Sequence, residues 1–133
     1  MTEIAYFTPK SKTGSAHYLD IYNADLFWGT SDLTNLWNQN AVQLRTYQGG
    51  ANGVIRAYFT MPAADYCLVI AKLSGGGSQV EIKIGSSATG TFTIAGNGDE
   101  IPLVAHLPAG SHWIDIKQLS GSLWIHSITC FRI

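Results

Sequence analysis

Short segments in which apolar and polar residues alternate, separated by clusters of turn residues, run through most of this sequence. From position 49 onward, Gly, Ser, Thr and Asn recur about every eight to twelve residues. The segment QVEIKI at 79–84 alternates strictly, which is typical of a strand with one buried and one exposed face. Regular short strands of this kind predict an all-β fold, either a sandwich or a barrel.

The alternation and the turn residues together predict the positions of most strands. Tyr66 to Leu73 is almost continuously apolar and is expected to form a central strand. In the last strand, 123–133, Leu123 and Ile125 fall on one face and Trp124, His126 and Ile128 on the other, unless a bulge shifts the alternation. The other strands are expected at 4–7, 18–22, 42–47, 55–61, 79–84, 92–94, 101–107 and 112–117. One short helix at most is expected, capped by Ser31 or Asp32, with Leu33, Leu36 and Trp37 on one face.

Composition favours one folded domain with an almost uncharged surface. The chain has 133 residues, and eight Lys and Arg against nine Asp and Glu give a net charge of 8 − 9 = −1. Charged residues are 13% of the chain, about half the usual ~25%. We therefore predict a single β-sandwich domain over 1–133 and no nucleic-acid partner.

Targeting signals are lacking in this sequence. No apolar run approaches the ~18 residues that cross a bilayer. The start, MTEIAYFTPKSKTG, does not have the basic and apolar segments of a signal peptide. We therefore expect no membrane span, and the sequence leaves the localisation unknown.

Two segments resemble the jelly-roll carbohydrate-binding modules of families six and thirty-five. VIRAYFTMPAADYCLVIAKLSGGGSQVEIKIG is similar to the middle of these modules, where a strand ends in Pro and a Tyr begins an apolar strand. IPLVAHLPAGSHWIDIKQLSGSLWIHSITCFRI is similar to their end, with a Leu-Pro-Ala-Gly-x-His turn before the two last strands. The resemblance covers roughly residues 42–133 and implies a galactose-binding-domain-like β-sandwich with a non-catalytic, sugar-binding role.

The sequence departs from these modules where they hold structural calcium. Modules of these families usually begin with paired glutamates and often carry an acidic residue in the last strand. Here the first strand offers only Glu3, and 123–133 has no acidic residue. Calcium takes roughly six to eight oxygen ligands, several of them carboxylates. We therefore expect no cofactor and no metal.

Aromatic residues on the last two strands form one candidate binding surface. Sugar rings have apolar C–H faces that stack on indole rings, and an exposed Trp in a small domain calls for an explanation. Trp113 falls opposite the inward set of its strand, beside Asp115 and Lys117. If the last two strands are neighbours, Trp113 and Trp124 share a face with Asp115, Lys117 and His126. The alternative is that this face is covered by other parts of the chain.

A second candidate surface is the aromatic and amide-rich stretch FWGTSDLTNLWNQN with the following RTYQGGANG. The resemblance maps this stretch onto the loops that form the usual sugar cleft. Neutral amides next to aromatic rings suit a neutral glycan, because rings stack and amides pair with hydroxyls. Trp28, Asn38, Asn40, Arg45 and Tyr47 are the candidate ligand-binding residues here. Trp37 is expected to fill one end of the core.

Catalysis is not predicted. The sequence contains no GxSxG, HExxH, Walker or GxGxxG pattern. Asp99 and Glu100 are adjacent in a turn and point apart. His106, His112 and His126 lie on successive strands, and a metal site requires that they converge; His112 is expected to fix its turn by hydrogen bonding instead.

The two cysteines, Cys67 and Cys130, lie in strands without CxxC spacing. We expect buried free thiols, and the sequence alone leaves a disulfide open.

These observations favour a non-catalytic, lectin-like module that recognises a neutral glycan or polysaccharide. The alternative is a structural, assembly or toxin-complex subunit whose aromatic faces are protein–protein interfaces, with a homo-oligomer as one form. The sequence does not identify the sugar.

Overall fold

The computed structural model describes residues 1–7, 19–22, 24–27, 42–46, 54–121 and 123–133. These residues form strands and turns, with no helix, and so no helix within them is long and apolar enough to cross a membrane. The strands are β1 (Thr2–Phe7), β2 (Leu19–Tyr22), β3 (Ala24–Phe27), β4 (Val42–Thr46), β5 (Val54–Met61), β6 (Asp65–Ser74), β7 (Gln79–Ile84), β8 (Ala88–Thr93), β9 (Asp99–Leu107), β10 (Gly110–Ser120) and β11 (Leu123–Arg132).

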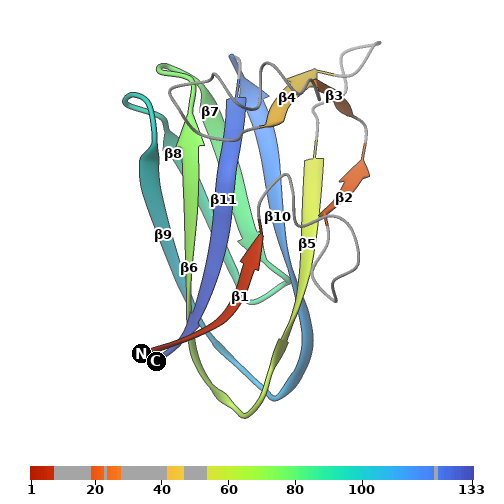
Figure 1. Ribbon diagram of the computed structural model, residues 1–133, viewed down its shortest axis with the longest axis vertical. Coiled ribbons are helices and arrows are strands. Elements are labelled where there is room, and N and C mark those ends of the chain that lie inside the picture. The colour runs from red at the N-terminus through yellow and green to blue at the C-terminus, as the bar shows by residue number, and fades with distance from the viewer. Residues whose placement is uncertain (8–18, 23, 28–41, 47–53, 122) are drawn as a thin grey trace.

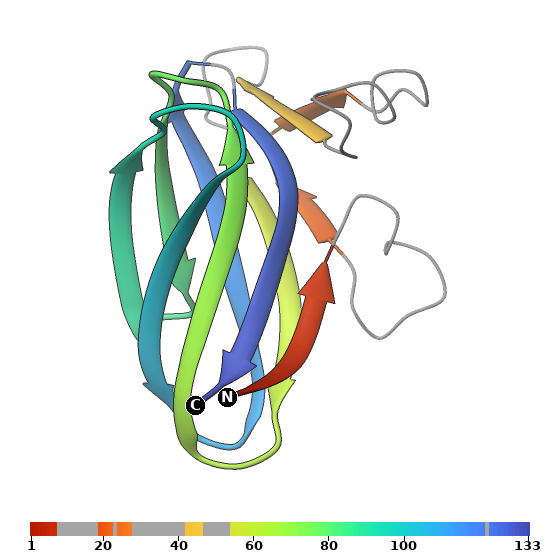
Figure 2. The same ribbon diagram turned by 60° about the vertical axis from the view of Figure 1, so that its left-hand side comes forward.

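The described strands pair into two antiparallel sheets that face each other (Figures 1 and 2). The six-stranded sheet has the order β3-β4-β11-β6-β9, and β1 pairs with β11. The five-stranded sheet has the order β2-β5-β10-β7-β8. Successive strands often lie in opposite sheets, as in a jelly roll. The predicted all-β sandwich is therefore confirmed.

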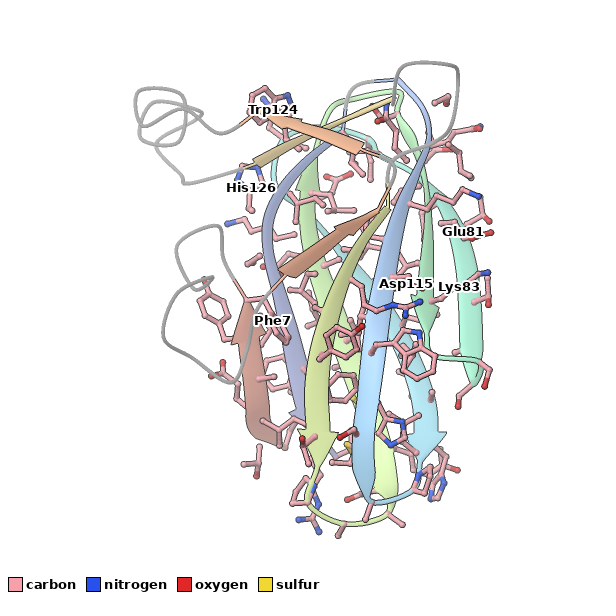
Figure 3. All side chains as sticks on the ribbon, turned by 90° about the vertical axis from the view of Figure 1, so that its right-hand side faces the viewer. Phe7, Glu81, Lys83, Asp115, Trp124 and His126 are labelled. Atoms are coloured by element: carbon pink, nitrogen blue, oxygen red, sulfur yellow. The ribbon has the colours of Figure 1, made fainter. Side chains whose placement is uncertain are left out.

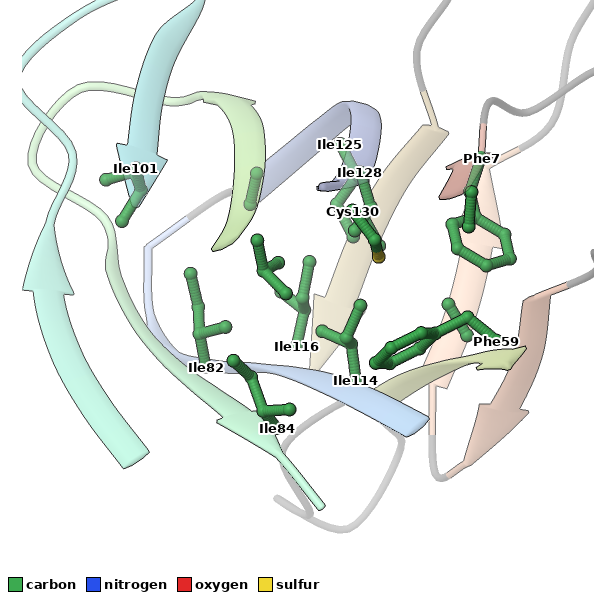
Figure 4. Close-up of a cluster of buried hydrophobic side chains, with 14 of the residues drawn as sticks. Phe7, Phe59, Ile82, Ile84, Ile101, Ile114, Ile116, Ile125, Ile128 and Cys130 are labelled. Atoms are coloured by element: carbon green, nitrogen blue, oxygen red, sulfur yellow. The ribbon is translucent and has the colours of Figure 1, made fainter. Parts of the chain in front are cut away.

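Alternation along each strand explains why the two sheets pack face to face. Inward side chains of β7 and β10, such as Ile82, Ile84 and Ile114, are buried and point toward Ile128 and Cys130 of β11 (Figure 4). Each fully buried Ile stabilises the fold by roughly 1.5–3 kcal/mol relative to an exposed one. Shifting any strand by one residue would turn this set outward, so the core fixes the register.

Most predicted strands are present within one or two residues of their expected ends. β3 was not predicted, because its four residues ADLF are too short to show alternation. β8 begins at Ala88, four residues before the start of the strand expected at 92–94. The expected helix near Leu33 and Trp37 lies outside the described residues.

A bulge in β11 shifts its alternation. Trp124 and Ile125 of β11 pair with Ser74 and Leu73 of β6. The next residue of β6, Lys72, pairs with Ser127 and not with His126. His126 is the extra residue, and both Ile125 and His126 are buried. The expectation that Trp124, His126 and Ile128 share a face is therefore wrong, while the shift that a bulge would cause is confirmed.

The β10–β11 turn closes the end of the sandwich that lies opposite the two termini, called the loop end below (Figure 1). Gly121 has φ +80°, and a Cβ there would lie 2.9 Å from the Cα of Ser78. Gln118 is buried and donates a hydrogen bond from its amide to the Gly121 carbonyl. A side chain at position 121 would therefore strain the backbone and collide with the β6–β7 turn.

The two thiols are free and buried, as expected. Cys67 of β6 and Cys130 of β11 lie on neighbouring strands. The hydrogen bond with Cys67, together with burial, raises the pKa of the Cys130 thiol, so this thiol is protonated at neutral pH. Protonated, inaccessible thiols are poor nucleophiles.

We predict that neither thiol reacts with Ellman's reagent in the folded protein, because the reagent needs an accessible thiolate. After unfolding in guanidinium chloride, both should react. The variant Thr93→Cys, which places a thiol at an exposed position of β8, is the positive control and should react at once. Rapid labelling of the unmodified folded chain, or a disulfide detected by mass, would contradict the prediction.

Candidate functional site

The outer face of the five-stranded sheet carries an aromatic and charged cluster centred on Trp113. Ile114 and Ile116 of β10 are buried in the core, so Trp113, Asp115 and Lys117 point outward. Tyr58 of β5 lies directly opposite Trp113, and its neighbours Ala57 and Phe59 are buried. Trp113 and Tyr58 are each half-buried. The predicted outward side of β10 is therefore confirmed.

Arg56 links this cluster into one unit. Its Nε and Nη2 atoms donate to the two carboxylate oxygens of Asp115 at 2.7 and 3.0 Å. Two parallel charge-assisted hydrogen bonds hold both groups in a fixed plane. The guanidinium carbon also lies 5.0 Å from the centre of the Trp113 ring, within the range of a cation–π contact.

The indole of Trp113 is thus held on two sides. Arg56 lies over the ring, and a Cβ at Gly85 would meet the Cε2 and Cζ2 atoms at 3.8 Å. Part of the ring is therefore covered within the domain, and its use as a sugar platform stays a prediction. What the surface offers is the uncovered part of the indole beside a fixed guanidinium and carboxylate.

Further polar side chains extend the same face. The register places Lys83 of β7 next to Asp115, and Glu81 next to Lys117. Lys83 and Glu81 form an ion pair with 3.6 Å between Nζ and Oε1. Figure 3 shows Asp115, Lys83 and Glu81 together on this face, and Trp124 far from them near β3 and β4. β8 adds exposed threonines, Thr89 and Thr91.

Trp124 belongs to the other sheet. It lies on β11, between Gln43 of β4 and Ser74 of β6, and is half-buried. The expectation that Trp113 and Trp124 share a face is therefore wrong. β10 and β11 are consecutive but lie in different sheets, and a sequence pattern reveals the face of a residue but not the sheet.

His126 lies beneath the loop end, with 4% of its surface exposed. Its Nε2 atom is 2.6 Å from Ser74 Oγ, which also accepts a hydrogen bond from the Gly98 N–H at 2.7 Å. Ser74 thus joins β11 to the end of β6 and to the β8–β9 turn. The sequence pattern predicted His126 beside Trp124 on an outer face. That prediction is wrong, because His126 is buried.

Most of the second candidate surface lies outside the described residues. This applies to Trp28, Asn38, Asn40 and Tyr47. Arg45 lies on β4 and pairs in register with Asp25 of β3. Trp28 directly follows β3 and Tyr47 directly follows β4 in the sequence, and these residues remain predictions.

The other two histidines of the described residues, His112 and His106, make contacts within the domain. His112 donates from Nε2 to the carbonyl of Pro108 at 2.8 Å, which confirms that it fixes the Pro108–Gly110 turn. His106 is exposed and makes an edge-to-face contact with Tyr66. Among the described residues, no group of three or more His, Cys, Asp or Glu side chains gathers in metal-binding geometry.

Three carboxylates of the described residues, Asp65, Asp99 and Asp115, make structural contacts. Asp115 pairs with Arg56 and Asp65 with Arg132. The hydrogen bond from Arg132 and one from the Tyr66 backbone hold the pKa of Asp65 below its usual value. Asp99 accepts hydrogen bonds from the backbone N–H groups of Ala95 and Gly96 and so fixes the β8–β9 turn.

We predict that Ser74→Ala lowers the free energy of unfolding by about 1–3 kcal/mol, because buried partners lose their hydrogen bonds. Ser127→Ala, on the outer side of β11, is the matched control and should change the free energy by less than about 0.5 kcal/mol. Urea unfolding followed by tryptophan fluorescence measures both. Equal effects of the two substitutions would show that the Ser74 contacts contribute nothing.

Comparison with known proteins places this geometry in a known fold. No protein-family model matches the sequence, and none of the curated proteins matches it. Among solved structures, a carbohydrate-binding module (CBM6cm-2) from Cellvibrio mixtus lichenase 5A, in complex with cellotriose, is similar. It has a TM-score of 0.64 and 17% identity, and the match covers 99% of each chain.

Two further modules are similar over nearly their whole length. A family 35 carbohydrate-binding module from Clostridium thermocellum has a TM-score of 0.63 and 17% identity, covering 97% of this chain and 98% of that one. The C-terminal family 6 module of a marine laminarinase from Zobellia galactanivorans has a TM-score of 0.58 and 11% identity, covering 96% and 98%. The protein therefore has the jelly-roll fold of family 6 and family 35 carbohydrate-binding modules, as the sequence resemblance implied.

Proposed function

We propose that the protein is a non-catalytic module that binds a neutral glycan on the outer face of the five-stranded sheet. The fold it shares with carbohydrate-binding modules supports the class of ligand. Fold alone does not determine function, so the proposal depends on the Trp113 cluster itself.

The single observation that carries the proposal is the fixed unit of Trp113, Arg56 and Asp115. Sugars present apolar C–H faces and hydroxyls that both donate and accept hydrogen bonds. The indole and the Tyr58 ring supply apolar surface, the guanidinium supplies donors and the carboxylate supplies acceptors. Because the ion pair and the cation–π contact already hold these groups, little side-chain entropy is lost on binding.

Charge on this face suits a neutral ligand. Arg56 with Asp115 and Lys83 with Glu81 form two neutral pairs, and Lys117 adds one positive charge. A strongly anionic glycan would need unpaired cations, and the pairs here would have to be broken to supply them. We therefore expect uncharged polysaccharides to bind in preference to uronates.

We predict that the protein binds at least one soluble neutral polysaccharide among β-glucan, xylan, galactan and galactomannan, measured by affinity gel electrophoresis and isothermal titration calorimetry. Trp113→Ala should weaken this binding at least about tenfold, or ~1.4 kcal/mol, because it removes the indole and releases Arg56. The variant must keep its melting transition for the comparison to hold.

Trp124→Ala is the matched control, since it removes a half-buried indole from the other sheet. It should leave affinity within about twofold of the unmodified protein, or ~0.4 kcal/mol. The opposite pattern would move the site to the loop end, where Trp124 and β4 lie. Absence of binding to every polysaccharide by the folded protein would reject glycan binding as a whole.

A further inference from the structure

Part of the outer face of the six-stranded sheet is apolar, whereas a sandwich face open to water is usually polar. Three large apolar side chains of the described residues are exposed in addition to Met1 and Ile133. They are Tyr6, Tyr66 and Val104. Their exposed fractions are 49%, 54% and 49%. All three point outward from this sheet, because they alternate with buried residues of β1, β6 and β9.

Register shows that these residues belong to one continuous patch. Moving from β11 across β6 to β9, one row is Thr129, Ile70 and Pro102, and Tyr6 of β1 pairs with Thr129. The next row is Phe131, Leu68 and Val104. Tyr66 and His106 follow at the end nearer the termini. We call these residues the apolar patch; its members are Tyr6, Tyr66, Leu68, Ile70, Pro102, Val104, His106 and Phe131.

The area of the apolar patch approaches what a weak interface needs. A half-exposed tyrosine leaves on the order of 100 Å² accessible, and the patch as a whole leaves roughly 500 Å². Two such patches bury about 1,000 Å², the lower limit for a specific interface. The largest apolar patch of a monomer is about 300–600 Å² and is often functional.

Charge at the patch boundary favours a second copy of this chain as the occupant. The row beyond Ile70 toward the loop end holds Lys72 and Glu100, which are opposite each other in register. The other boundary holds Tyr66 and His106. Consider a two-fold axis that lies in the plane of the contact and runs perpendicular to the strands. It places the row that contains Ile70 over the row that contains Leu68 of the other copy.

In that arrangement, Lys72 of one copy would lie over Tyr66 of the other, and Glu100 over His106. The apolar rows meet in the centre. A net charge of −1 gives almost no long-range repulsion between copies.

We infer that the protein forms a weak two-fold dimer in which the apolar patches of two copies pack face to face. This inference does not depend on glycan binding, because the Trp113 cluster lies on the outer face of the other sheet. In the dimer, both five-stranded sheets face away from the contact and remain accessible. Two identical binding faces on one particle would then bind a polysaccharide with avidity.

Sedimentation velocity over a concentration series tests the dimer. The unmodified protein should shift from monomer to dimer with a dissociation constant of about 10 μM or weaker, given the small area. Val104→Lys should weaken dimerisation at least about tenfold, because symmetry places the charge twice in the contact. A protein that stays monomeric up to about 1 mM overturns the inference.

Thr93→Lys is the matched control, since it places the same charge at an exposed edge-strand position of the other sheet. It should dimerise as the unmodified protein does. If Val104→Lys loses its melting transition, Tyr66→Lys repeats the test at the most exposed member of the patch. A dimer that a folded charged patch variant leaves intact also overturns the inference, because the contact then lies elsewhere.

Discussion

Burial of one face of each sheet against the other is the constraint on which the rest of this structure depends. β5, β7 and β10 supply branched and aromatic side chains from one side, and β6, β9 and β11 supply them from the other. Because side chains alternate along a strand, burying one set fixes which residues point outward. The Trp113 cluster and the apolar patch are both consequences of this choice. Neither surface can change its residues without a matching change of register in the core.

The sequence was sufficient to predict the fold class because period-two alternation is a local signal. It placed Trp113 outside and Ile114 inside, and it identified the role of His112 in its turn. It did not predict which strands are neighbours, so Trp113 and Trp124 were expected on one face. The irregular alternation of the last strand indicated a bulge but did not place it at His126, because the pairing with β6 decides where the extra residue lies. β3 was missed because a four-residue strand is held by its pairing with β4 rather than by its own pattern.

The two outer faces differ in how their polar groups are used. On the five-stranded sheet, a bidentate ion pair and a cation–π contact hold a planar guanidinium against an indole. This partly buried, bidentate pair fixes the orientation of the guanidinium and the carboxylate relative to the indole. On the six-stranded sheet, apolar side chains are continuous from β11 across β6 to β9, and the charged Lys72, Glu100 and Glu3 lie at the edges of this patch. The first face suits a ligand with directed hydroxyls, and the second suits a flat apolar partner.

Separation of these faces has a mechanical consequence. Ser74 and Gln118 connect the turns at the loop end by buried hydrogen bonds, and Arg132 pairs with Asp65 near the termini. The core between the sheets is close-packed, so neither face can slide relative to the other. Contact on one face therefore leaves the geometry of the other unchanged. Two independent surfaces on a rigid scaffold allow binding and association to combine by avidity, without requiring any conformational change in the domain.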